Sequence, residues 1–233
     1  MAELVLYFAP DSCARVTLMA LEEIGCPYSL EVVSIMKRQH RSPEYLALNP
    51  SGKVPTLVVE GRPLTENVAI LSWLASEFPD AGLLPPASGL DHFQQLADLA
   101  YFASGLHPIV TRLRVPHFLC DHPEGRDRVF GMAEIAMAIN FRVIEERLAR
   151  STWWYGKQWS VLDHYLNWVW FRVSGTAFDT TPYPNFSRHA EQLKERPAYQ
   201  RALKRNDEVS AALAAQGLAV RFDGPAAAQP ASL

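Results

Sequence analysis

Apolar positions fall in short runs over the first 80 residues and then recur at helical spacing over most of the remaining chain. Leu4–Phe8, Tyr28–Val33 and Thr56–Val59 are short segments rich in apolar, aromatic and β-branched residues, which is typical of buried strands. Pro63–Thr65 begins a fourth strand after a tight turn at 60–62. The pattern therefore predicts a small sheet in the first third of the chain.

Helices are predicted between and after these strands. One runs from about Cys13 to Ile24 and stops at Gly25, and a short one ends at Leu48. A third helix begins at Glu66–Asn67. The order βαβ, α, ββα makes the first two strands a parallel pair and is that of an α/β thioredoxin-like domain with a mixed sheet.

The segment Pro79–Gly89 is rich in proline and glycine and interrupts the periodicity. We therefore expect a thioredoxin-like domain over 1–80, a linker over 81–89 and an all-α helical-bundle domain over 90–215. Residues 216–233 have low complexity and are expected to form a flexible tail. Within 123–150, one helix face carries the apolar residues Met132, Ile135, Ala136, Ile139 and Val143.

Composition narrows the class of protein. The chain has 233 residues and a formal net charge of −3, with no basic excess to suggest nucleic acid or a membrane surface as partner. Its start lacks the pattern of a signal peptide, and no apolar run reaches transmembrane length. Cys13, Cys26 and Cys120 lack metal-ligand spacing. We expect reduced thiols, no metal and a cytoplasmic location.

The stretch 49–67 carries the features that suggest a ligand. Pro55 cannot donate to a sheet, so we hypothesise a cis Val54–Pro55 bond that turns the Val54 backbone outward to pair with a peptide-like ligand. An ordinary trans proline at a strand start is the alternative. Glu66 and Asn67, at a helix N-terminus, could hold the ammonium and carboxylate of one zwitterion. The alternative is a plain first-turn glutamate and an N-terminal cap.

Cys13 is the strongest candidate for chemistry. It lies where a strand-end loop enters a helix, a position that lowers a thiol pKa. It could act as a nucleophile or bond to a ligand's sulfur; Ser12 could do the latter with its hydroxyl. A merely buried cysteine is the third reading. His107 matters only if its helix faces the Cys13 loop.

Five motifs resemble those of a glutathione transferase: SCARVTLMALEEIG, KVPTL, LTEN, WSVLDHYLNWVW and YPNFSRHAEQLKERPAYQRAL. The resemblance covers essentially the whole chain except the tail and is greatest for the bacterial beta class. It implies a thioredoxin-like domain followed by a helical domain, a homodimer, and glutathione bound as co-substrate on the first domain.

The resemblance also implies roles for single residues. Val54, beside a cis Pro55, would pair with the cysteinyl backbone of glutathione, while Glu66 and Asn67 would hold its γ-glutamyl end. Other assignments are Lys53 and Lys37 at the carboxylates, Cys13 or Ser12 at the sulfur with His107 nearby, and an electrophile pocket around Phe8, Leu106, Val110, Arg114 and Tyr165.

Three positions depart from the family pattern. Asn67 replaces a usual serine, Ala14 stands where the beta class tends to have serine, and Pro108 stands where it tends to have lysine. The last two remove polar groups from the expected sulfur site. The implied activity is a detoxification reaction in which the glutathione thiol attacks a small hydrophobic electrophile. Alternatives on the same fold are thiol–disulfide exchange through Cys13, a specialised lyase, isomerase or dehalogenase, and a non-catalytic binding or regulatory protein.

Overall fold

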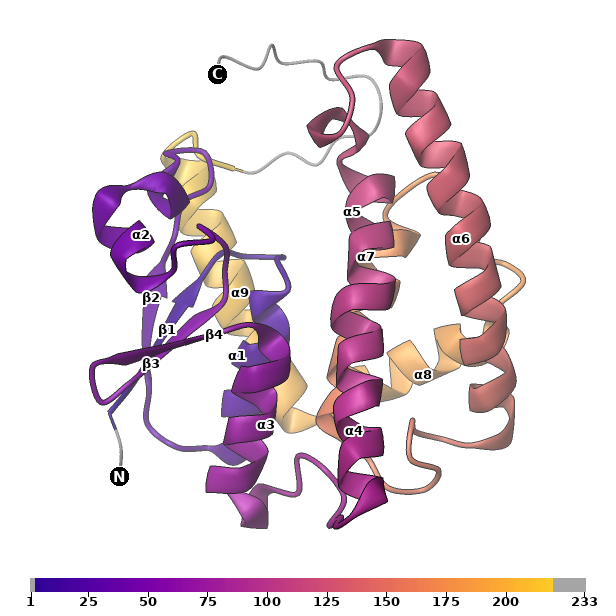
Figure 1. Ribbon diagram of the computed structural model, residues 1–233, viewed down its shortest axis with the longest axis horizontal. Coiled ribbons are helices and arrows are strands. Elements are labelled where there is room, and N and C mark those ends of the chain that lie inside the picture. The colour runs from indigo at the N-terminus through magenta and orange to yellow at the C-terminus, as the bar shows by residue number, and fades with distance from the viewer. Residues whose placement is uncertain (1–2, 220–233) are drawn as a thin grey trace.

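The computed structural model describes residues 3–219 and begins with a four-stranded mixed sheet (Figure 1). Its strands are β1 (Leu4–Phe8), β2 (Ser29–Val32), β3 (Thr56–Val59) and β4 (Arg62–Thr65), in the spatial order β2-β1-β3-β4. β1 pairs parallel with β2, and the other pairs are antiparallel. The expected thioredoxin-like topology is confirmed.

Three helices belong to this part of the chain: α1 (Ala14–Ile24), α2 (Pro43–Leu48) and α3 (Asn67–Glu77). α1 ends at Gly25, whose φ of 72° is the left-handed conformation that glycine adopts without strain. α2 starts at Ser42, whose side chain accepts a hydrogen bond from the Tyr45 backbone. α1 and α3 cover the face of the sheet that is turned toward the helical half (Figure 1).

The second half is helical, as expected. Its α-helices are α4 (Leu90–Ala100), α5 (His107–Arg114), α6 (Pro123–Arg150), α7 (Val161–Ser174), α8 (Pro184–Lys194) and α9 (Pro197–Ala215). A π-helical stretch, Tyr101–Leu106, joins α4 to α5. Pro108 cannot donate the backbone hydrogen bond of a regular helix, and this wider turn ends just before it. Most of the expected tail, 220–233, lies outside the described residues.

The helical half is attached to the first half mainly through α1, which packs on α7 and α9. Glu23 of α1 accepts hydrogen bonds from Arg196 at 2.7 and 2.8 Å and lies 3.1 Å from Nε2 of His164. The preceding residue, Glu22, pairs with Arg201 at 2.8 Å and with Arg205 at 2.6 Å. The two halves are therefore joined by half-buried ion pairs as well as by apolar packing.

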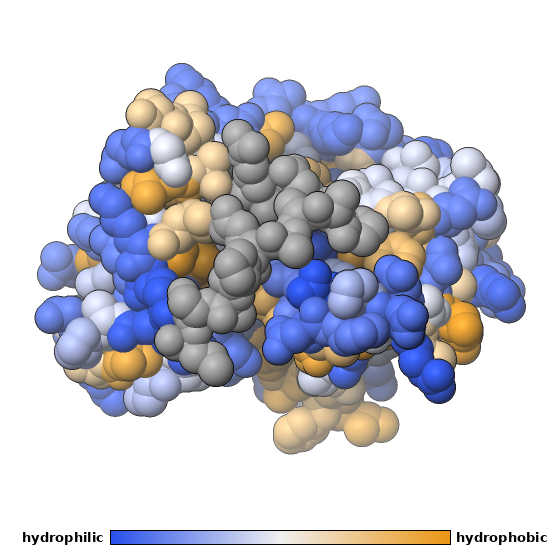
Figure 2. All heavy atoms as spheres, turned by 90° about the horizontal axis from the view of Figure 1, so that it is seen from above, coloured by the Kyte–Doolittle hydropathy of each residue, from blue (hydrophilic) through white to orange (hydrophobic). Residues whose placement is uncertain are grey.

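One apolar stripe faces outward. Along α6, Met132, Ile135, Ile139 and Val143 are 56–63% exposed. The opposite face of the same helix supplies fully buried core residues, among them Phe141. Seen from above, the surface is largely hydrophilic, with hydrophobic residues in separate patches (Figure 2). No helix within residues 3–219 is both long enough and apolar enough to cross a bilayer.

Candidate active site

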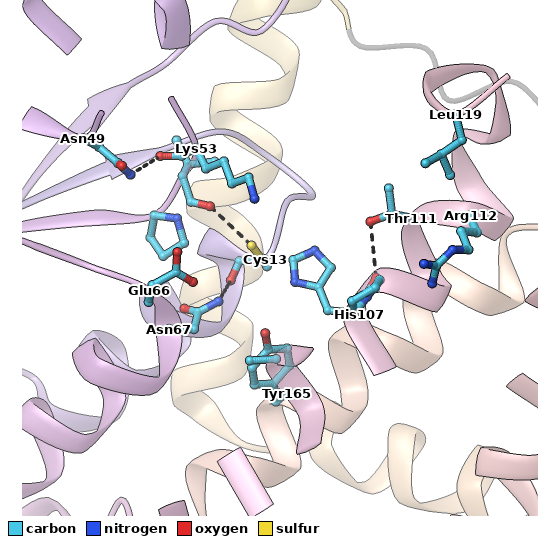
Figure 3. Close-up of a pocket in the computed structure, with 14 residues that line it drawn as sticks. Cys13, Asn49, Lys53, Glu66, Asn67, His107, Thr111, Arg112, Leu119 and Tyr165 are labelled. Atoms are coloured by element: carbon cyan, nitrogen blue, oxygen red, sulfur yellow. Dashed lines mark hydrogen bonds between the residues drawn. The ribbon is translucent and has the colours of Figure 1, made fainter. Parts of the chain in front are cut away.

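A cavity of about 310 Å³ opens between the sheet half and the helical half, and Cys13 is one of the residues that line it (Figure 3). Its walls come from the loop before β3, the start of α3, the π-helical stretch with α5 and the turn that follows, and α7. The lining residues are Cys13, Asn49, Lys53, Val54, Pro55, Glu66, Asn67, Ala103, His107, Pro108, Thr111, Arg112, Leu119 and Tyr165.

The loop before β3 is held by a cis peptide bond, by a hydrogen bond from Asn49 and by a close backbone contact at Gly52. The Val54–Pro55 bond is cis, as hypothesised. Asn49 is buried and donates from Nδ2 to the Lys53 carbonyl at 2.8 Å. Gly52 has a φ of 61°, and a Cβ there would lie 2.7 Å from the His40 carbonyl oxygen, so the position requires glycine. This loop presents the Val54 backbone and the Lys53 side chain to the cavity.

The start of α3 forms the adjoining wall. Glu66 precedes the helix with a φ of 67°, a strained conformation for a residue with a side chain, and its carboxylate lies at the cavity (Figure 3). Asn67 is 5% exposed. Its Oδ1 accepts from Thr17 Oγ1 at 2.8 Å, and its Nδ2 donates to the Cys13 carbonyl at 3.1 Å. The side-chain amide of Asn67 therefore positions Cys13. The backbone N–H of Asn67, at the helix start, can still bind a ligand.

The thiol of Cys13 is a neutral donor. Its Sγ lies 3.4 Å from the Val54 carbonyl oxygen, to which it donates. Burial raises the pKa of Cys13 to about 12, and the nearby carboxylate of Glu66 acts in the same direction. The expectation of a lowered pKa at the start of α1 is therefore wrong, because desolvation outweighs the backbone hydrogen bond at Cys13 and the cations of Arg172 and Lys53.

His107 faces the Cys13 loop, so it meets the condition set by the sequence for a role in the site. Its ring points toward the Cys13 sulfur (Figure 3) and lies edge-on to Trp168, with centroids 4.6 Å apart. Burial lowers the pKa of His107 to about 4, and the positive charges of Lys53 and Arg172 contribute. The imidazole is therefore neutral at pH 7.

Two residues of the helical half hold the Cys13 loop. Asp11 has a φ of 60°, and its backbone N–H donates to Asn206 Oδ1 at 2.9 Å. Asn206, 2% exposed, donates in return from Nδ2 to Asp11 Oδ1 at 3.0 Å. Trp168 donates from Nε1 to the Asp11 carbonyl at 3.2 Å. Trp168 therefore touches both His107 and the Cys13 loop, a link that the sequence did not indicate.

Ser12 and Lys37 lie away from the cavity. The Ser12 hydroxyl donates to the Ala9 carbonyl at 2.6 Å and accepts from the Ala14 N–H at 3.2 Å. The backbone of this turn therefore uses the hydroxyl both as donor and as acceptor. Lys37 is exposed and is not among the lining residues. Of the two rivals for the sulfur position, the geometry favours Cys13.

Four of the five residues expected to form the electrophile pocket do not line the cavity. Phe8 and Leu106 have no exposed area and Val110 is 2% exposed, because all three belong to the hydrophobic core. Arg114 donates to the Gly175 carbonyl. Tyr165 is the member that does line the cavity, and its hydroxyl points toward Cys13 (Figure 3).

The residues that replace them come mainly from the α5 side: Ala103, Pro108, Thr111, Arg112 and Leu119. Asn49 was also missed. Residues 103, 107 and 111 are spaced by four, as are 108 and 112, so they share one side of the helical stretch. This spacing is visible in the sequence, but nothing in the sequence says which side of the helix faces Cys13.

Comparison with known proteins gives one family. A family model described as the glutathione S-transferase N-terminal domain matches residues 12–77. Glutathione S-transferase GstA of Escherichia coli O157:H7 is 30% identical over 215 residues, which is 91% of this chain and 98% of GstA. The disulfide-bond oxidoreductase YfcG of Escherichia coli K12 is 28% identical, over 85% of this chain and 93% of YfcG. A solved sphingomonad glutathione S-transferase complexed with glutathione superimposes with a TM-score of 0.76 at 28% identity, over 87% of this chain and 98% of that one.

Proposed function

This chain belongs to the glutathione S-transferase family, and we propose that it is an enzyme that activates the thiol of glutathione for attack on a small electrophile. The observation that carries the proposal is the convergence of three groups on one point of the cavity. They are the Cys13 thiol, the neutral His107 imidazole and the backbone of Val54 beside a cis proline.

The cavity matches glutathione group by group in this proposal. The N–H and C=O of Val54 pair with the backbone of the cysteinyl unit. Glu66 binds the γ-glutamyl ammonium, and the free N–H groups at the start of α3 bind the adjacent carboxylate. Lys53 binds the glycyl carboxylate. The glutathione sulfur then lies beside Cys13.

Binding changes the partner of Cys13. Its thiol donates to the Val54 carbonyl in the free protein. On binding, a backbone N–H of glutathione donates to that carbonyl instead. The Cys13 S–H then turns to the glutathione sulfur and stabilises its thiolate, together with an N–H from neutral His107. The thiol proton passes to water. Lowering the thiol pKa by about two units corresponds to about 2.7 kcal/mol and makes most of the bound thiol reactive at pH 7.

The chemical step is a displacement or an addition. In displacement, the thiolate electron pair forms a sulfur–carbon bond while the bond from that carbon to its leaving group breaks, and the leaving group departs with the bonding pair. Attack of this kind requires a thiolate. The raised pKa of Cys13 is the reason to assign the nucleophile to glutathione and not to Cys13. It also argues against thiol–disulfide exchange through Cys13.

The test measures glutathione binding by calorimetry and thiolate formation by ultraviolet absorbance, in wild type, Cys13→Ser, Cys13→Ala and the control Cys26→Ala. We expect wild type and Cys13→Ser to lower the pKa of bound glutathione, because both retain a donor. Cys13→Ala should bind glutathione but lower its pKa less, and Cys26→Ala should match wild type. Absence of glutathione binding in wild type would refute the proposal. Disulfide reduction that disappears in Cys13→Ser while conjugation persists would assign Cys13 a separate reaction.

We also propose that the enzyme is a homodimer that buries the α6 stripe of Met132, Ile135, Ile139 and Val143. Four apolar side chains more than half exposed on one helix face are typical of an interaction surface. Ile139→Glu should convert a dimer into a monomer, as measured by size exclusion with light scattering. Asp127→Asn, an exposed change on the same helix but away from the stripe, is the control. A wild-type monomer at micromolar concentration would contradict the proposal.

A further inference from the structure

The part of the cavity that glutathione leaves open is walled chiefly by α5 and its neighbours. Ala103, Pro108 and Leu119 give apolar surface, and Thr111 gives a hydroxyl whose hydrogen bond goes to the His107 carbonyl at 3.3 Å. Arg112 is exposed and also lines this part. The electrophile therefore meets a largely apolar wall that contains one guanidinium.

Pairing the charged groups of glutathione with the cavity leaves one cation of the lining unmatched. The lining carries one carboxylate, on Glu66, and two cations, on Lys53 and Arg112. Glu66 and Lys53 match the ammonium and the glycyl carboxylate of glutathione, and the γ-glutamyl carboxylate binds the N–H groups at the start of α3. His107 is neutral at pH 7, because burial and the nearby cations lower its pKa to about 4. One positive charge, that of Arg112, is left on the electrophile side.

Arg112 is available for a ligand. Within residues 3–219 it forms no hydrogen bond or ion pair with another residue, whereas Arg114, two positions on, donates to the Gly175 carbonyl. Figure 3 places Arg112 on the α5 side, beyond Thr111 as seen from Cys13. An arginine at the edge of an apolar cavity matches a carboxylate by geometry as well as charge.

The helix sets the length of the ligand. Arg112 follows His107 by five residues, which is a rise of about 7.5 Å along α5. A single aromatic ring with substituents at opposite positions spans a similar length. A ligand whose reacting carbon lies beside the glutathione sulfur, near His107, would therefore place a group on the far side of its ring near Arg112.

We infer that the electrophile of this enzyme carries a carboxylate about one ring length from its reacting carbon, and that Arg112 binds this carboxylate. The inference rests on the proposed function, since it places glutathione in the cavity first. A model reaction is the attack of glutathione on 4-chloro-3-nitrobenzoate. The sulfur–carbon bond forms, the carbon–chlorine bond breaks, chloride leaves with the bonding pair, and the thiol proton goes to water.

The test uses two conjugates of glutathione that differ only in charge: S-(4-carboxy-2-nitrophenyl)glutathione and its carboxamide twin. Their affinities are measured by calorimetry for wild type, Arg112→Gln and the control Arg150→Gln, an exposed arginine at the end of α6. We expect Arg112→Gln to weaken the carboxylate conjugate about tenfold and the carboxamide less than about twofold. Added salt should weaken the carboxylate conjugate more in wild type than in Arg112→Gln. Arg150→Gln should behave as wild type.

Equal losses for the two conjugates in Arg112→Gln, or no loss for either, would overturn the inference. The proposed function is tested separately, by turnover of 4-chloro-3-nitrobenzoate and its carboxamide with glutathione. Charge-dependent binding without turnover of either would leave the carboxylate site standing and refute the transferase. Failure of glutathione and both conjugates to bind would overturn both.

Discussion

The acidity of Cys13 leads to a quantitative prediction. Burial raises its pKa from 9.0 to about 12, so at pH 8 its thiolate is about a thousandfold scarcer than that of an ordinary cysteine. Iodoacetamide reacts with the thiolate. Alkylation of Cys13 should therefore be about a thousandfold slower than that of a model thiol, and its rate should rise tenfold per pH unit up to pH 10.

His107→Ala probes the cause. The imidazole is neutral, so its removal opens the cavity to water beside Cys13 without removing a charge. Relief of desolvation should lower the Cys13 pKa, and each unit recovered should accelerate alkylation tenfold. We expect at least a tenfold increase, read by mass spectrometry of the Cys13 peptide, with Cys120 as an internal reference whose rate stays unchanged. Wild-type Cys13 that reacts as fast as Cys120 at pH 8, or a rate that levels off below pH 9, would refute the reasoning.

Two further predictions concern the junction between the halves. For Glu23, burial alone would raise the carboxyl pKa, but hydrogen bonds from Arg196 and His164 outweigh it and lower it to about 2. This stabilisation, about 1–2 kcal/mol after solvent screening, is present above pH 4.5 and is lost as the pH falls toward 2. Glu23→Gln should lower the free energy of unfolding in urea by that amount at pH 7. It should also reduce the fall of that free energy below pH 4.5, and an unchanged fall would contradict the assignment. Trp168→Phe keeps the aromatic contact with His107 but removes the donor to the Asp11 carbonyl. It should cost about 1–2 kcal/mol and lower kcat more than glutathione affinity, whereas unchanged kcat would exclude a positioning role.

The fold could be predicted closely from the sequence because its signals are local. β1 and β3 begin and end where the apolar runs do, and Gly25 ends α1 through its own backbone freedom. The cis bond before Pro55 and the nearness of His107 to Cys13 also followed, from a proline at a strand start and from the family resemblance. These features depend on short motifs whose geometry changes little with context.

The electrophile wall could not be predicted in the same way. Leu106, at the end of the π-helical stretch, and Val110 of α5 were expected to line it. Both are buried in the core, while Thr111 and Arg112 line the cavity. A π-helical stretch adds a residue to one turn, so the side of α5 that faces Cys13 cannot be counted from the start of α4. The prediction of a lowered Cys13 pKa was wrong for a related reason. A helix N-terminus is visible in the sequence, but the depth at which folding buries the thiol, which raises its pKa, is not.

The reciprocal hydrogen bonds between Asp11 and Asn206 join residues 195 positions apart. A ribosome releases Asp11 long before Asn206, so the two partners coexist only after a further 195 residues have been synthesised. Closing so long a loop brings an entropic cost that earlier contacts must already have offset. The Cys13 loop of a nascent chain therefore lacks one of its fixed supports until α9 docks. A chain that stops before Asn206 has every residue that lines the cavity but lacks the hydrogen bonds that hold Asp11 in the Cys13 loop.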